Sequence, residues 1–211
     1  GWGKAAESWT SDEVLDNLYA LSDSPVMLGE LLDLLRYRYE QIDFIDEPVD
    51  LGFDCPLDLH CTYTLRQIMA AFDYYNFAAL AGVGVKWFKD KNIDIFFVTL
   101  NKAAKDYSPT TMYNDYSINE ILFHWQSQSN TAADSPTGQR YIHHRERGSK
   151  VLLFVREFKA DRITGGAEAY TFLGTANYVK HEGSRPMNIT WQLDRPIPAK
   201  FLKKTNKLVV G

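Results

Sequence analysis

The sequence has no long hydrophobic run and very little cysteine. No apolar stretch approaches the roughly 18 residues that a membrane helix needs, and no basic leader followed by an apolar segment and a cleavage site stands at the start. The two cysteines, Cys55 and Cys61, are too few for a disulfide framework, so free thiols are expected. These absences favour a cytoplasmic globular protein.

Sequence motifs that carry catalysis are missing as well. The chain has no G-x-S-x-G nucleophile elbow, no glycine-rich phosphate loop ending in Lys-Ser/Thr and no H-E-x-x-H helix. Cys55, His60 and Cys61 suggest zinc, but no second pair of ligands with usable spacing follows them. We therefore expect no metal, no cofactor and no catalytic residue in this chain.

Acidic and basic residues are divided unevenly along the chain. The overall net charge is −4, but residues 1–80 hold 4 Lys and Arg against 15 Asp and Glu, a net charge of −11, whereas residues 81–211 hold 19 against 12, a net charge of +7. An acidic module thus precedes a basic one. Such an asymmetry indicates an anionic partner for the basic part.

Helical periodicity dominates the acidic module. Capping-box spacing at Thr10 and at Thr64 precedes apolar stripes, and Ser24-Pro25 is a typical start for another helix. Three helices with one apolar stripe each predict a small helical bundle within residues 1–80. Gly82 and Gly84 then interrupt the pattern, which places the boundary of the module close to residue 80.

Short runs of β-branched and aromatic residues, bounded by turn residues, dominate the rest of the chain. The expected strands are 93–100, 118–127, 150–157, 169–174, 187–193 and 207–210. One helix is expected at 136–147, because Ser135 is a good N-cap and Pro136 suits the first helical position. The predicted fold is α+β, with the helical bundle followed by a curved β-barrel or sheet domain over residues 81–211.

An aromatic run in the strand at 118–127 is the strongest candidate for a binding site. Strand alternation puts Phe123 and Trp125 on one face and His124 on the other, with Asp115 and Tyr116 close by in sequence. Aromatic faces beside a carboxylate can stack a flat heterocycle and recognise its edge. The competing interpretation is that alternating aromatics, Phe123 in particular, belong to the core.

Several stretches resemble a known family, the domain of originally unknown function at the C-terminus of bacterial chains that carry a phospholipase-D-type nuclease and a helicase-type translocase. The likeness runs in order over roughly residues 54–200, and includes PLDLH at 56–60 and LFHWQSQ at 122–128. The other matching stretches are 96–100, 108–111, 115–116, 135–138, 145–148, 151–155, 170–174, 181–183 and 185–186.

The resemblance implies a fold similar to the SET-and-RING-associated (SRA-like, PUA-like) DNA-binding domains. It also implies that the chain recognises 5-methylcytosine or 5-hydroxymethylcytosine in duplex DNA by base flipping. The chain would then be the target-recognition part of a type IV, modification-dependent restriction enzyme of phage defence, with helicase and nuclease domains of the same full-length chain as partners and no membrane.

Residue roles within this function follow from chemistry and from order along the chain. Tyr116 and Trp125 are expected to stack on the flipped base, and Asp115 is expected to accept a hydrogen bond from its exocyclic amine. Tyr113, Phe123 and His124 are expected to line the wall near the 5-substituent. The side chains expected to hold DNA phosphates are those of Lys102, Lys105, Arg140, His143 and Arg145.

Two other function classes remain open from the sequence. The chain could be a metal-dependent nuclease or other hydrolase that uses Asp115, Glu120 and His124. It could also be a protein–protein adaptor module of a helicase, with its basic surface docked on an acidic partner. Steep salt dependence of binding to unrelated duplex DNA would count against the adaptor.

Overall fold

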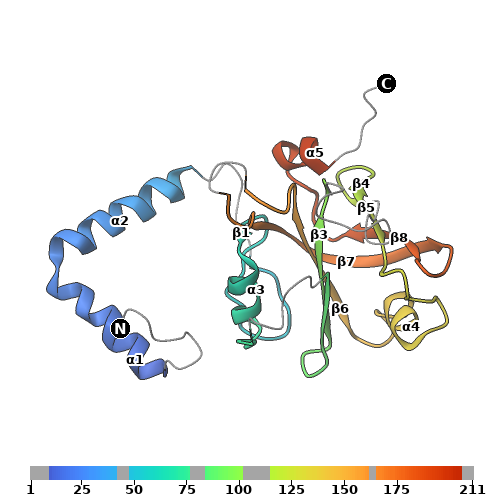
Figure 1. Ribbon diagram of the computed structural model, residues 1–211, viewed down its shortest axis with the longest axis horizontal. Coiled ribbons are helices and arrows are strands. Elements are labelled where there is room, and N and C mark those ends of the chain that lie inside the picture. The colour runs from blue at the N-terminus through green and yellow to red at the C-terminus, as the bar shows by residue number, and fades with distance from the viewer. Residues whose placement is uncertain (1–9, 42–47, 77–83, 102–114, 162–164, 206–211) are drawn as a thin grey trace.

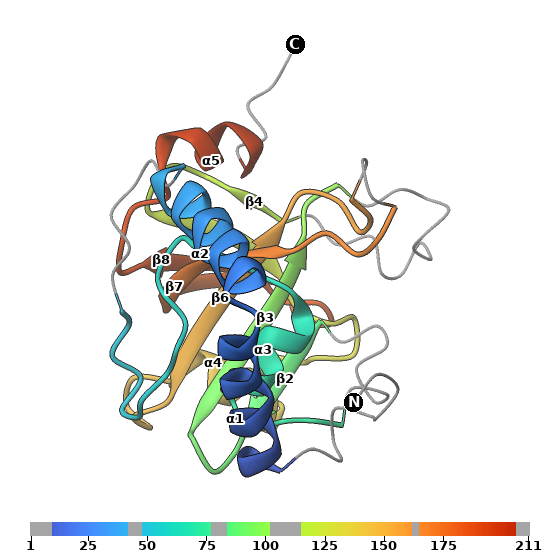
Figure 2. The ribbon, with the colours of Figure 1, turned by 90° about the vertical axis from the view of Figure 1, so that its left-hand side faces the viewer.

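The computed structural model contains one large mixed sheet with a few helices (Figures 1 and 2). The structure describes residues 10–41, 48–76, 84–101, 115–161 and 165–205. The strands are β1 (Thr62–Tyr63), β2 (Val85–Phe88), β3 (Ile93–Thr99), β4 (Tyr116–Ser117), β5 (Leu122–Gln126), β6 (Lys150–Arg156), β7 (Tyr170–Glu182) and β8 (Asn188–Leu193). The helices are α1 (Ser11–Tyr19), the 3-10 helix η2 (Ala20–Asp23), α2 (Pro25–Glu40), α3 (Leu65–Ala71), α4 (Pro136–Ile142) and α5 (Ala199–Thr205). The predicted α+β class is confirmed.

The strands pair in the order β2-β3-β6-β7-β8-β5-β4, and β1 pairs with β7. The pair β3 and β6 is parallel, whereas the other pairings between named strands are antiparallel. Among the described strands, β2 and β4 form the two ends of an open sheet. The long connection between β3 and β6 contains β4, β5 and α4, so the stretch that the sequence singled out lies on this crossover.

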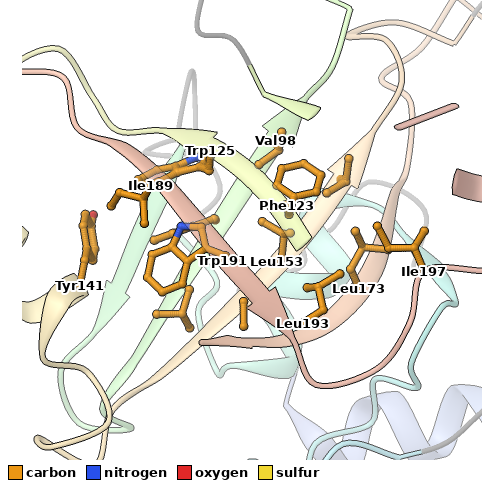
Figure 3. Packing of buried hydrophobic residues seen from close by; sticks show 14 of the residues in the cluster. Val98, Phe123, Trp125, Tyr141, Leu153, Leu173, Ile189, Trp191, Leu193 and Ile197 are labelled. Carbon is orange, nitrogen blue, oxygen red and sulfur yellow. The ribbon is translucent and has the colours of Figure 1, made fainter. Parts of the chain in front are cut away.

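The sheet curls until its inner face closes on itself. Phe96 of β3 and Trp125 of β5 are separated by three strands, which is about 19 Å along a flat sheet. Their ring centroids are nevertheless 4.0 Å apart, with an angle of 15° between the rings. Tyr141 of α4 and Trp191 of β8 pack edge-on against Phe96. Figure 3 shows Trp125, Tyr141 and Trp191 together in this core. The inner core formed in this way includes Phe96, Val98, Phe123, Trp125, Tyr141, Leu153, Leu173, Ile189, Trp191 and Leu193.

The outer face of β3 and β6 is also covered, by α3 and by the chain that precedes it. Ile68 and Met69 of α3 are fully buried in a second cluster with Phe97 of β3 and Phe154 of β6. Since β3 and β6 are covered on both faces, they read in the sequence as continuous apolar runs rather than as alternating patterns.

The first three helices do not form the small bundle predicted from their apolar stripes. α1 and α2 have no buried residue, whereas α3 packs on the sheet. The predicted helix starts are correct, because both capping boxes are present and Ser24 precedes α2. An amphipathic stripe shows that a helix can bury one face, but not which partner covers that face. Within the acidic module predicted over residues 1–80, α3 and β1 therefore belong to the packing of the sheet.

Most strands fall where the alternation predicts them, but β7 is longer. It continues past Gly174, where the sequence analysis ended it, and the pairing of β6 with β7 shifts register at Leu153 and Phe154. Gly174 has a φ of +88°, and a Cβ there would lie 2.7 Å from Cδ1 of Leu59. The glycine therefore belongs to a β-bulge inside a continuing strand. The strand expected at 207–210 lies outside the described residues.

None of the described helices is both long enough and apolar enough to span a membrane. Cys55 and Cys61 are both free thiols in the structure.

Candidate nucleic-acid interface

β4 and β5 form a hairpin at one end of the sheet, and it carries an aromatic pair. Tyr116 is the register partner of His124. Their rings stack with centroids 4.8 Å apart and an angle of 12° between them. Since Phe123 and Trp125 alternate with His124 and face the inner core, the stacked pair lies on the outer face of the sheet.

The carboxylate of Asp115 lies at the base of this hairpin. Asp115 is buried, and its Oδ1 accepts a hydrogen bond of 2.9 Å from the backbone N–H of Gln126. This bond ties the start of β4 to the end of β5.

A row of side chains on the outer face begins with the aromatic pair. His124 is the register partner of Thr190 on β8, and Thr190 is the register partner of Lys180 on β7. Register partners lie side by side on one face of a sheet, so the row runs Tyr116, His124, Thr190, Lys180. Lys180 keeps 66% of its side chain exposed and lies 3.7 Å from a carboxylate oxygen of Glu182. An aromatic pair, a hydroxyl group and an ammonium group thus follow one another across four strands.

Lys180 and Thr190 are members of this row that the sequence did not predict. Thr190 is buried, whereas Lys180 is exposed. β7 was expected to end at Gly174, which left Lys180 without a strand and without a register partner. The signal that could have found it is the alternation of polar and apolar residues from Thr175 to Tyr178, which continues the strand beyond the glycine.

The structure places Phe123 and Trp125 in the inner core rather than on the surface of the site. Phe123 is fully buried, and Trp125 keeps 4% of its surface exposed while it stacks on Phe96. Both side chains pack within the core, on the face of β5 opposite to the one that carries His124. We therefore leave both residues out of the base pocket proposed below.

Arg140, expected to bind a phosphate, is engaged in a buried ion pair. Its Nε donates to Oδ2 of Asp94 at 2.7 Å and its Nη2 donates to Oδ1 at 3.0 Å. The guanidinium also lies over the ring of Trp87, 4.3 Å from the centroid. Burial raises the pKa of the Asp94 carboxyl, although Arg140 acts in the opposite direction. The pair fastens α4 to β3, and Arg140 is therefore a structural residue.

His143 and Arg145, the other described residues expected to bind phosphates, lie nearer the surface. His143 is the C-cap of α4, and its Nδ1 lies 3.0 Å from a carboxylate oxygen of Glu146. Arg145 donates from Nε to Oδ1 of Asn177 at 2.9 Å, which brings its guanidinium to β7, the strand that carries Lys180. Tyr113, Lys102 and Lys105 lie outside the described residues.

His144 explains why α4 ends at Ile142 instead of near residue 147. Its ring is buried, with Nδ1 3.1 Å from the carbonyl oxygen of Ser149, while Nε2 accepts a hydrogen bond of 3.0 Å from the backbone N–H of Tyr178. Because a carbonyl only accepts and an N–H only donates, the proton sits on Nδ1 and the ring is neutral. The chain leaves the helix here so that the ring can reach β7.

Burial lowers the pKa of His144, and this predicts a loss of stability in acid. The unfolded chain takes up a proton near its ordinary pKa of about 6.5, whereas the folded chain resists it, so the free energy of unfolding should fall as the pH drops below about 6.5. We expect the melting temperature to decrease between about pH 7.5 and about pH 5.5, and to decrease less in His144→Gln. His143→Gln, at a ring with 40% of its surface exposed, is the matched control and should follow the wild type. Equal pH dependence in all three proteins would contradict the role of His144.

The residues that form the sheet and the helices packed on it identify the family of the chain. Residues 57–204 match a family described as "Domain of unknown function (DUF3427)". The chain belongs to the DUF3427 family. The match covers almost the same residues as the resemblance found in the sequence, and it contains the sheet, α3, α4 and the hairpin of the site.

Solved structures similar to this DUF3427 chain include the 5-hydroxymethylcytosine-specific restriction enzyme AbaSI, with 14% sequence identity and a TM-score of 0.33 over 54% of this chain. They also include the DNA recognition domain of the cytosine modification-dependent restriction endonuclease LpnPI, with 8% identity and a TM-score of 0.31 over 53% of this chain. The match spans 32% of the AbaSI chain and 58% of the LpnPI chain. No curated protein matches the chain.

Asp115 and Glu120, the carboxylates of the alternative hydrolase hypothesis, lie at different ends of the hairpin. Glu120 lies in the turn between β4 and β5, whereas Asp115 lies at the opposite end of the hairpin, where it contacts Gln126. In the part of the chain that the structure describes, no group of three His, Cys, Asp or Glu side chains is placed to hold a metal ion.

Proposed function

We propose that this chain recognises 5-methylcytosine or 5-hydroxymethylcytosine in duplex DNA, and that it flips the modified base out of the helix to do so. The observation that carries the proposal is the stacked Tyr116 and His124 pair beside the buried carboxylate of Asp115. The resemblance of the sequence to the recognition part of modification-dependent restriction enzymes supports it. The chain would act as a recognition domain without catalysis of its own, and would serve helicase and nuclease domains of the same full-length chain.

The site would recover the cost of base extrusion through stacking and hydrogen bonding. Unpairing and unstacking a base costs a few kcal/mol, and each stacked aromatic returns about 1 to 3 kcal/mol. The carboxylate of Asp115 would accept from the exocyclic amine of cytosine. Tyr113 remains proposed for the wall near the 5-substituent.

Cations near the site would hold the DNA backbone. Lys180 stands at the far end of the row that begins with Tyr116, and Arg145 reaches the same strand through Asn177. Phosphate contacts position a protein on DNA without reading its sequence. The proposed backbone contacts are Lys102, Lys105, His143, Arg145 and Lys180, and Arg140 is withdrawn because it is paired with Asp94.

Binding to matched duplexes that carry cytosine, methylcytosine or hydroxymethylcytosine at one position tests the proposal. Tyr116→Ala and His124→Ala should each reduce the preference for the modified duplex by about 1 to 3 kcal/mol, because each removes a stacking ring. Asp115→Asn should reduce it as well, since an amide can present a donor where an acceptor is needed. Fluorescence anisotropy gives the dissociation constants.

Two control variants separate recognition from general affinity. Arg145→Ala should weaken binding to all three duplexes equally and flatten the salt dependence. Tyr75→Ala removes another exposed tyrosine, located after α3. It should change neither the affinity for DNA nor the preference for the modified duplex. The proposal fails if the wild type binds the three duplexes equally, or if Tyr116→Ala and His124→Ala stay folded and keep the full preference.

A further inference from the structure

The segment from residue 10 to residue 41, which contains α1, η2 and α2 and which we call the arm, is a pair of amphipathic helices with an uncovered apolar face. Of the 15 large hydrophobic side chains exposed in the described protein, 12 belong to the arm, and no residue of α1 or α2 is buried. Figure 1 shows α1 and α2 lying away from the sheet. The family match begins only at residue 57, so the arm lies outside the matched residues.

The apolar side chains of α2 follow a helical stripe. Met27, Leu31, Leu34 and Leu35 recur at intervals of three or four residues, and their side chains are between 38% and 59% exposed. At 100° per residue these four side chains fall within an arc of about 100°. Asp33 lies on the far side of the helix, and Glu30 borders the stripe next to Leu34. α1 has only 9 residues, and isolated helices shorter than about 12 to 15 residues are marginal in water. A partner that covers the exposed apolar side chains of both helices would supply the stabilisation that α1 lacks.

The charge of the arm selects the kind of partner. Two arginines against seven acidic residues give residues 10–41 a net charge of −5. This charge disfavours phosphates of DNA and anionic lipid surfaces, because both are negative. It also disfavours pairing of two arms from two copies, since their acidic residues would repel each other. The basic sheet domain of a second copy offers no matching apolar surface among the described residues, where Tyr75, Ile118 and Val179 are the other exposed large hydrophobics.

We propose that the arm is a docking element for a protein surface with an apolar centre and a rim of lysine and arginine. The apolar stripe of α2 would pack on the centre, and the acidic residues of both helices would meet the basic rim. The arm would then attach the DNA-recognition domain to its partner. The outer face of the sheet would stay unobstructed.

The experiment uses the whole chain and a synthetic probe, an amphipathic helical peptide of leucine and lysine carrying a fluorescent label. Wild-type protein should bind this peptide, and Leu31→Ser/Leu35→Ser should bind it at least tenfold more weakly while unfolding at the same temperature, because neither leucine is buried. A peptide of serine and lysine tests the apolar part, and a peptide of leucine and glutamate tests the charge. Both should bind at least tenfold more weakly than the leucine and lysine peptide.

Three results would overturn the assignment. Equal binding of the leucine and lysine peptide by the wild type and by the double variant would show that the arm is not the docking element. If the wild type bound the leucine and glutamate peptide as tightly as the leucine and lysine peptide, the partner would not need a basic rim. A dimer in light scattering that becomes a monomer in Leu31→Ser/Leu35→Ser would show that a second copy covers the stripe.

Discussion

Trp125→Ala should lower the free energy of unfolding by about 3 to 5 kcal/mol, the usual cost of removing a large buried aromatic side chain. Trp125 stacks on Phe96 and meets Tyr141 edge-on, with ring centroids 5.6 Å apart. Its ring therefore connects β5 to β3 across the inner core, and alanine would leave a cavity where the curled sheet closes. Urea denaturation followed by fluorescence or circular dichroism measures the loss.

The matched control is the next side chain on the other face of the same strand. His124→Ala should cost about 1 kcal/mol or less in unfolding free energy, because its ring contacts Tyr116 on the outer face. The difference in unfolding free energy between the two variants thus distinguishes a core residue from a residue of the proposed site on the same strand. A Trp125→Ala protein of wild-type stability that no longer prefers modified DNA would return Trp125 to the base pocket.

Asp94→Ala should destabilise the protein by about 3 to 5 kcal/mol, because it leaves the guanidinium of Arg140 buried without its partner. The side chains of Asp94 and Arg140 are 1% and 17% exposed, so water can replace little of the lost pairing. Asp94→Leu combined with Arg140→Met should be less destabilising than Asp94→Ala, since it removes both charges and keeps an apolar contact. Thermal or urea unfolding of the three proteins gives the comparison.

An exposed ion pair of similar length is the control. Asp33 and Arg36 are also 3.0 Å apart, but their side chains are 77% and 68% exposed. Asp33→Ala should cost between about 0 and 1 kcal/mol, because solvent screens such a pair. If Asp94→Ala were no more costly than Asp33→Ala, Arg140 would be available for phosphates, as the sequence first suggested.

Local signals in the sequence predicted where helices begin, because a cap is a contact between neighbours in the chain. The caps at Thr10, Thr64 and Ser135 each accept a backbone hydrogen bond in the structure, and each begins a helix as expected. The C-terminal ends of the helices and the surfaces they pack on depend on residues far away in the sequence. The sequence did not predict either. α4 ends early because the ring of His144 reaches Tyr178, which lies 34 residues further along the chain.

Some of the geometry around the candidate site was predictable from the sequence, and some was not. Alternation along β5 correctly separates Phe123 and Trp125 from His124, but it cannot show which face the curling sheet turns inward. Arg140 looked like a phosphate ligand because its partner, Asp94, lies on a strand 46 residues earlier. The residues that complete the row, Thr190 and Lys180, depend on pairing between strands that are far apart in sequence.

The position of the hairpin on a long crossover sets the order in which the domain can be completed during synthesis. Gln126 of β5 hydrogen-bonds Asn188 of β8, and 62 residues separate them in the chain. At a synthesis rate of about 5 to 20 residues per second, β5 waits roughly 3 to 12 s for its neighbour to be made. During that interval Phe123 and Trp125 lack the cover that Ile189 and Trp191 later provide, and β5 has an unpaired edge open to other chains. Addition of β8 therefore removes both of these exposures at once.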